Sequence, residues 1–122
     1  MSVTTDYWIK DKVVTATALV DVSVDDDLSN SINIIGKIVC GILIPAALTN
    51  TTITIKGSVD GTNFYGIRDE NNSTLYDSIT VTVATVLRLK VTDFTPFRYI
   101  KISMPDGAEG ADRSFTVIMR YV

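Results

Sequence analysis

The chain has 122 residues, of which 46% are hydrophobic and 20% are charged, and its net charge is −3 at pH 7. This composition is typical of one globular domain and argues against a largely disordered chain. Histidine is absent and cysteine occurs once, which excludes His-based triads, His metal ligands, internal disulfides and zinc sites with several Cys ligands. The acidic balance argues against binding to nucleic-acid phosphates, and no apolar run reaches the roughly 18 residues of a membrane span.

The first dozen residues, MSVTTDYWIKDK, lack the alternation of a strand and are predicted to form an N-terminal arm over residues 1–12. They show no basic segment followed by an apolar one, so we expect no secretion signal. The arm holds the only tryptophan of the chain, Trp8, between Tyr7 and Ile9. Burial of such side chains is favourable, so we expect them to dock on the chain's own body or on a neighbouring subunit. We predict Tyr7, Trp8 and Ile9 as a partner interface.

Val, Ile and Thr, which favour the pleated surface of a sheet, make up 44 of the 122 residues. Apolar and polar residues alternate plainly over 52–59, 79–83 and 115–121, as in half-buried strands. No segment has a helical period over three turns, although residues 45–48 could form one short helical turn. We predict strands over residues 13–24, 31–35, 37–44, 52–59, 64–68, 74–83, 86–91, 97–103 and 114–121.

A structural turn is predicted at Asp60 and Gly61, because glycine adopts positive φ at no steric cost and the flanking segments are strand-like. The other predicted loops are 69–73, 93–96 and 105–113. Many short strands at near-regular spacing indicate an all-β, antiparallel sandwich or barrel rather than a βαβ fold. The chain has no internal repeat or linker, so residues 13–122 are predicted to form a single β-sandwich domain.

Asp25, Asp26 and Asp27 are consecutive carboxylates, which raises the question of a metal site. The alternating spacing of an EF-hand loop is missing, so we expect a solvated turn and no metal. Cys40 lies in an apolar run without an evident cation or base to activate it, so we expect a buried, small hydrophobic side chain. No nucleophile has a visible base. We therefore expect no enzymatic activity, no catalytic residue and no cofactor.

Two segments resemble the galactose-binding-like jelly rolls, the group that contains the discoidin domains. SVDGTNFY at 58–65 is similar to that group's S-x-D-G-x-x-aromatic hairpin, and FRYIKI at 97–102 is similar to its a-R-Y-I-R-I strand. Both motifs are mainly architectural, one a tight hairpin and the other a core strand. The resemblance implies that the sandwich is a jelly roll.

A resemblance over residues 31–122 is to a family of small virion proteins of tailed bacteriophages. In that family a Gly- and Ile-rich segment ending in Pro-Ala comes first, and then S-x-D-G-x-x-F/Y, R-Y-I/L-K-I/L and A-D-R before a last strand. Here GKIVCGILIPAALT at 36–49, SVDGTNFY, FRYIKI and ADR at 111–113 follow in that order. Residues 1–30 match nothing in the family.

The second resemblance implies a non-enzymatic structural protein of the virion, with capsid decoration (cement) as its role. It implies a homotrimer bound to the major capsid protein on the capsid surface, after assembly in the cytoplasm of the bacterial host. Neither nucleic acid nor membrane is expected as a partner.

The alternative is a carbohydrate-binding module of a phage tail fibre or baseplate, with a host glycan as ligand. Its pocket would lie in loops 60–63, 71–73 and 106–113, gathered at one end of the sandwich. Exposed aromatic residues in those loops would favour this alternative, and the loops contain none.

Overall fold

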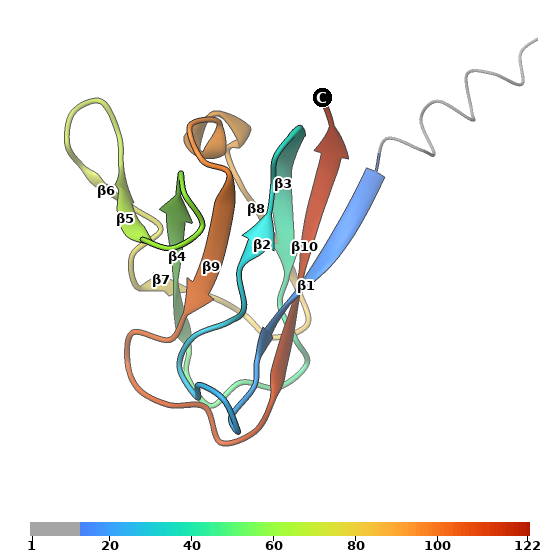
Figure 1. Ribbon diagram of the computed structural model, residues 1–122. Helices are drawn as coiled ribbons and strands as arrows, with labels where there is room; N and C mark the ends of the chain where they lie inside the picture. Colours follow the sequence, from blue (N-terminus) through green and yellow to red (C-terminus); the bar gives the residue numbers. More distant parts are fainter. Residues whose placement is uncertain (1–12) are drawn as a thin grey trace, which may run out of the picture.

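The computed structural model describes residues 13–122, and nearly all of its regular structure is β (Figure 1). The elements are β1 (Val13–Val20), β2 (Ile32–Asn33), β3 (Lys37–Leu43), β4 (Thr52–Ser58), β5 (Tyr65–Arg68), β6 (Thr74–Leu75), β7 (Ile79–Thr80), β8 (Val86–Arg88), the 3-10 helix η1 (Val91–Phe94), β9 (Tyr99–Ser103) and β10 (Arg113–Tyr121).

The strands form two sheets that pack face to face (Figure 1). The four-stranded sheet has the order β1-β10-β3-β8. The other sheet has the order β2-β9-β4-β5-β6, and β7 pairs with the first residues of β4. All the pairings between these strands are antiparallel. The prediction of an all-β, antiparallel β-sandwich is confirmed.

The core lies between the two sheets and is built mainly from β-branched side chains. On β10, the alternate residues Phe115, Val117 and Met119 are buried, as their period of two predicts. Full burial of each such side chain contributes about 1.5–3 kcal/mol to stability. The strand residues of the core are Ala18, Val20, Val39, Ile42, Ile53, Ile55, Ile67, Ile100, Ile102, Phe115, Val117 and Met119.

The strand predicted over 13–24 ends earlier, at Val20. Asp21 ends it, because its carboxylate accepts hydrogen bonds from the N–H and hydroxyl of Ser23, at 3.0 and 2.6 Å. The backbone C=O of Asp21 also accepts the N–H groups of Val24 and Asp25. These bonds curl the chain into a turn instead of continuing the ladder with β10.

The strand predicted over 74–83 is also wrong, since it is replaced by the two-residue strands β6 and β7. Between them, Tyr76 and Ser78 have positive φ values of 56° and 52°, which no extended strand contains. The hydroxyl of Thr54 accepts the N–H of Ser78 at 3.1 Å, and the C=O of Tyr76 accepts the N–H of Ile55 at 2.9 Å. The segment is therefore bent and lies along the edge of β4, where β7 also pairs.

Two further local predictions are corrected. Residues 45–48 form no helical turn, and the helical turn lies instead at η1, where the end of a strand and a loop were predicted. Phe94 explains this position, because the short helix buries its ring, 5.1 Å from the ring of Tyr76. Val59, expected on the buried face of its strand, is exposed because β4 ends at Ser58.

Gly57 provides a test of how closely the six-stranded sheet is packed. A Cβ atom built at Gly57 would lie 2.6 Å from the ring of Phe97, whereas one built at Gly66, on the paired strand β5, would meet nothing within 4 Å. We predict that Gly57→Ala lowers the free energy of unfolding by about 1–3 kcal/mol through overpacking. Gly66→Ala should change it by less than about 0.5 kcal/mol.

Urea denaturation of both variants, followed by circular dichroism, measures this difference. Equal effects of the two substitutions would contradict the close contact between Gly57 and Phe97.

Candidate functional site

The predicted interface residues Tyr7, Trp8 and Ile9 lie outside the described residues, as does the whole predicted arm, 1–12. The described chain begins at Val13, which is also the first residue of β1. The structure describes the surface around Val13 and the surroundings of the motif residues.

Asp60 and Gly61 lie in the loop between the antiparallel strands β4 and β5, where Gly61 has a φ of +81°. The carboxylate of Asp60 accepts the N–H groups of Thr62 and Asn63, both at 2.9 Å, and the Asn63 side-chain amide at 2.8 Å. The hydroxyl of Ser58 accepts the N–H of Gly61 at 2.9 Å. The hydrogen bonds to the Asp60 carboxylate lower its pKa well below its ordinary value, and the backbone N–H of Asn63 contributes most. The carboxylate organises its own loop.

Glu109 joins two loops at the opposite end of the sandwich. Its side chain is fully buried, and Oε1 accepts the N–H of Thr49 at 2.7 Å and Nε–H of Arg113 at 2.8 Å. Oε2 accepts the backbone N–H of Asn50 at 2.9 Å and its side-chain amide at 2.6 Å. The backbone N–H of Glu109 donates to the C=O of Asp26, which ties a third loop to the pair.

Side chains of the ADR segment at 111–113 also form hydrogen bonds with other loops. Asp112 accepts the backbone N–H of Val22 at 3.0 Å and so holds the turn that follows β1. Arg113 pairs with Glu109 and also donates to the hydroxyl of Thr49 at 3.3 Å. Two of the three side chains of this motif therefore fix loops to one another.

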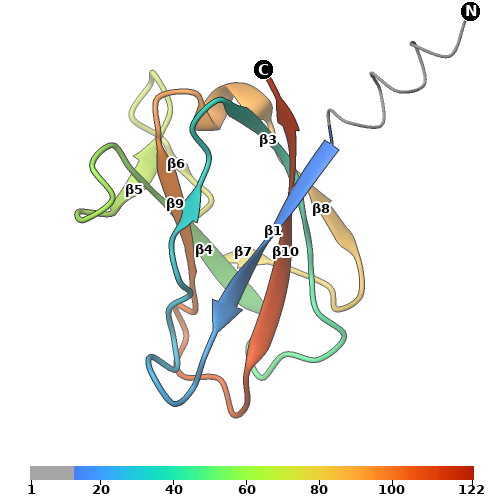
Figure 2. The same ribbon diagram turned by 45° about the vertical axis from the view of Figure 1, so that its right-hand side comes forward.

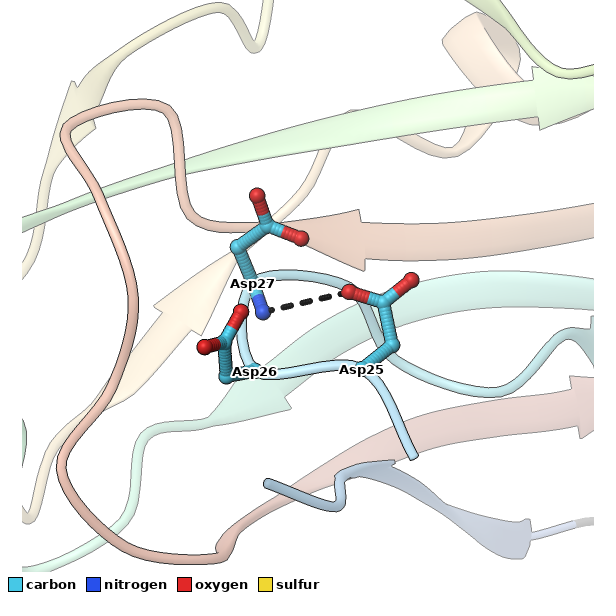
Figure 3. Close-up of side chains that lie close together, drawn as sticks. All are labelled: Asp25, Asp26 and Asp27. Carbon is cyan, nitrogen blue, oxygen red and sulfur yellow. Dashed lines mark hydrogen bonds between the residues drawn. The ribbon is translucent and has the colours of Figure 1, made fainter. Parts of the chain in front are cut away.

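Asp25, Asp26 and Asp27 are exposed and lie in the loop between β1 and β2, as Figure 3 shows. One carboxylate oxygen from each residue lies within 4.8 Å of the others. The N–H of Asp27 donates to Asp25 at 3.4 Å. The pKa of Asp27 is raised, first by a hydrogen bond with the Asp25 side chain and then by slight burial and repulsion from the neighbouring carboxylates. The exposure of all three side chains agrees with the predicted solvated turn.

Cys40 is half-buried rather than buried, which corrects the expectation for this residue. Between the pairs Met119–Val39 and Ile118–Gly41, β3 has one residue more than β10, and that residue is Cys40. The extra residue of a β-bulge turns its side chain out of the regular alternation. The thiol lies 3.8 Å from the C=O of Ile38.

The three loops predicted to form a glycan pocket do not meet. β4 and β9 are antiparallel, with Ser58 opposite Tyr99 and Thr54 opposite Ser103. Loop 60–63 follows Ser58 and loop 106–113 follows Ser103, so they lie at opposite ends of the sandwich. Loop 71–73 is at the tip of the β5–β6 hairpin, far from loop 106–113 (Figure 1). The prediction of one shared end is wrong, because antiparallel neighbours send their following loops in opposite directions.

A groove of about 620 Å³ lies beside β1, and its walls are mostly apolar. Thr17 and Leu19 of β1 form one wall, and residues of the loop before β2 form much of the rest. Sequence reasoning did not find this groove, because its walls are brought together by the packing of the two sheets. The groove is lined by Thr17, Leu19, Asp21, Val24, Asp25, Leu28, Ser29, Asn30 and Lys101.

No model of a known protein family matches the chain, and no curated protein shows significant similarity to it. Within residues 13–122, no helix combines the length and apolar character needed to cross a bilayer.

Glu109 provides a test of the loop contacts. Burial opposes ionisation of its carboxyl group, but the hydrogen bonds from Thr49, Arg113 and Asn50 outweigh burial and lower the pKa below its ordinary value of 4.5. The resulting stabilisation is complete above pH 4.5 and is lost as the pH falls through the lowered pKa. We predict that Glu109→Gln lowers the free energy of unfolding at pH 7 by about 1–3 kcal/mol, since an amide NH₂ would face donors.

Urea denaturation between pH 2 and pH 7 measures both effects. Glu70→Gln is the control, because Glu70 is the only other glutamate of the chain and is exposed. A Glu109→Gln variant as stable as the Glu70→Gln variant would contradict the role of Glu109.

Proposed function

We propose that the chain is a structural protein of a tailed-phage virion that decorates the capsid and binds the major capsid protein as a homo-oligomer. The proposal includes the jelly-roll topology and the location on the capsid surface that the resemblance implies. The order of the four motif segments supports it. The surroundings of these segments are consistent with a structural role, since the side chains of SVDG and ADR stabilise loops of the fold.

The observation that carries the proposal is a group of exposed apolar residues at one end of the four-stranded sheet, which we call the apolar end. β1 begins here and β10 ends here, next to the loop before β3, as both ribbon views show (Figures 1 and 2). The N–H of Val122 donates to the C=O of Gly36 at 3.0 Å, which brings these segments together. The apolar end consists of Val13 (44% exposed), Ile35 (51%), Tyr121 (50%) and Val122 (87%). Two cations lie among them: Lys37 Nζ is 5.9 Å from the centroid of the Tyr121 ring, and Arg120 is opposite Val13.

Clustered exposed apolar side chains mark interaction surfaces more often than isolated ones. Tyr121 is well suited to such a contact, because an aromatic residue buries a large area and keeps a polar group for hydrogen bonding. The predicted interface residues Tyr7, Trp8 and Ile9 precede Val13 by a few residues, so they and the apolar end can contact the same capsid surface. At about 25 cal/mol per Å² of apolar area, a modest contact repeated over many copies stabilises a shell substantially.

The test is co-sedimentation of the purified chain with capsid shells assembled from the major capsid protein of the same phage. We predict that deletion of residues 1–9, and separately the double substitution Ile35→Ser with Tyr121→Ser, weakens binding about tenfold or more. Both proteins should keep the circular dichroism spectrum of a folded β domain, since the altered residues are exposed or precede β1.

The matched control is Leu43→Ser with Val86→Ser. This facing pair is also exposed and apolar, but it lies at the other end of the four-stranded sheet. Full affinity in both the deletion and the Ile35/Tyr121 variant would exclude the apolar end as the capsid contact.

A further inference from the structure

β1 is an outer strand of the four-stranded sheet, and in the described chain only its β10 side is paired along its length (Figure 2). Leu19 directs its backbone groups away from β10: its N–H donates to Asn30 Oδ1 at 2.7 Å, and its C=O accepts the N–H of Asn30 at 3.2 Å. Because these groups alternate along a strand, those of Val13, Thr15 and Thr17 also point away from β10. Within residues 13–122 they have no backbone partner.

The other outer strands of the described sheets are too short to form an extended ladder with a strand of another molecule. β8 has three residues, and β2 and β6 have two each. β8 also contains Arg88 and is followed by Lys90, and such charges discourage pairing between edges. β1, in contrast, is the eight-residue segment VVTATALV, without a charge, a proline or a register shift. It therefore lacks the usual protection of a free edge.

We propose that two copies of the chain associate by antiparallel pairing of their β1 edges, about a two-fold axis beside Thr15. Thr15 then faces Thr15 of the second copy, and Val13 faces Thr17. Each facing pair exchanges two backbone hydrogen bonds, which makes about six in total. The two four-stranded sheets become one continuous sheet across both copies.

The strand that pairs with the free edge of β1 belongs to a second copy of the chain, because this edge is complementary to itself. The side chains of Val13, Thr15 and Thr17 are exposed and uncharged, and β-branched residues that face one another across strands stabilise a pair. Asn30 already occupies the edge at Leu19, so within residues 13–122 the unpaired outward groups of β1 are those of Val13, Thr15 and Thr17. An antiparallel pair centred on Thr15 uses the groups of all three residues in both copies, and a two-fold axis at Thr15 relates the copies.

The chain that precedes β1 fits the same arrangement. In an antiparallel pair, the residues before Val13 of one copy run past Thr17 and Leu19 of the other, toward the groove beside β1. The groove offers apolar surface at Leu28 and at Val24, which is 81% exposed.

Charge complementarity points the same way. The groove is lined by the carboxylates of Asp21 and Asp25 and by one lysine, Lys101, so its lining has a net negative charge. The three residues directly before Val13 are Lys10, Asp11 and Lys12, with a net positive charge.

The test uses the full-length purified chain alone, so its outcome does not depend on the capsid proposal. Sedimentation equilibrium should show a dimer. Thr15→Lys and Thr15→Glu should each raise the dimer dissociation constant about tenfold or more, because like charges would then face each other across the axis. An equimolar mixture of the two variants should restore the dimer, since the introduced lysine of one copy faces the introduced glutamate of the other. Native mass spectrometry identifies this mixed dimer.

The matched control is Thr74→Lys, an exposed threonine on β6, an outer strand of the other sheet. It should dimerise like the unaltered chain, and thermal unfolding checks that all variants are folded. A monomer, a trimer such as the resemblance implies, or a dimer that Thr15→Lys leaves intact would overturn the two-fold pairing. Failure of the lysine and glutamate variants to form a mixed dimer would also overturn it.

Discussion

The packing of two sheets against each other is the constraint on which the rest of this structure depends. β10 pairs with both β1 and β3, so the alternate side chains Phe115 and Val117 are held in the middle of the four-stranded sheet. Ile55 and Ile102, which are directly opposite on neighbouring strands, bury their side chains from the other sheet. Because the strand ladders run within each sheet, the layers are joined mainly through apolar contact. The groove and the free edge of β1 lie at the margin of that contact.

Polar side chains then fix the loops to this apolar core. Ser29 is buried, and it both donates its N–H to the C=O of Ile102 and accepts the N–H of Ile102 at its hydroxyl. Glu109 and Asp60 organise loops at opposite ends of the molecule in the same manner. Burial of polar groups such as those of Ser29 and Glu109 is tolerable only when they are hydrogen-bonded, and no described buried side-chain polar atom lacks a partner. Motifs that contain these residues therefore report the fold more directly than they report a ligand.

Sequence patterns predicted the fold well where one period dominated. Burial on β10 alternates from Phe115 to Met119, and the strand spans Arg113–Tyr121 where 114–121 was predicted. Prediction failed where a side chain bonded to a distant backbone group, as Thr54 does with Ser78 to bend the segment after β6. It also failed for Cys40, since a bulge depends on the register of a neighbouring strand. The contacts of Glu109 with Thr49 span 60 positions, a distance at which periodicity carries no information.

The bulge in β3 has a practical consequence. The only thiol of the chain lies on a central strand that pairs with both β10 and β8, yet it is partly open to solvent. A maleimide-linked fluorophore or nitroxide at Cys40 would therefore mark one defined point of the scaffold, without a cysteine having to be removed elsewhere. The distance between two such labels measures how copies are arranged relative to one another, in solution or on a larger assembly. Because the β-bulge partly exposes Cys40, this residue is a natural attachment site for distance measurements between copies.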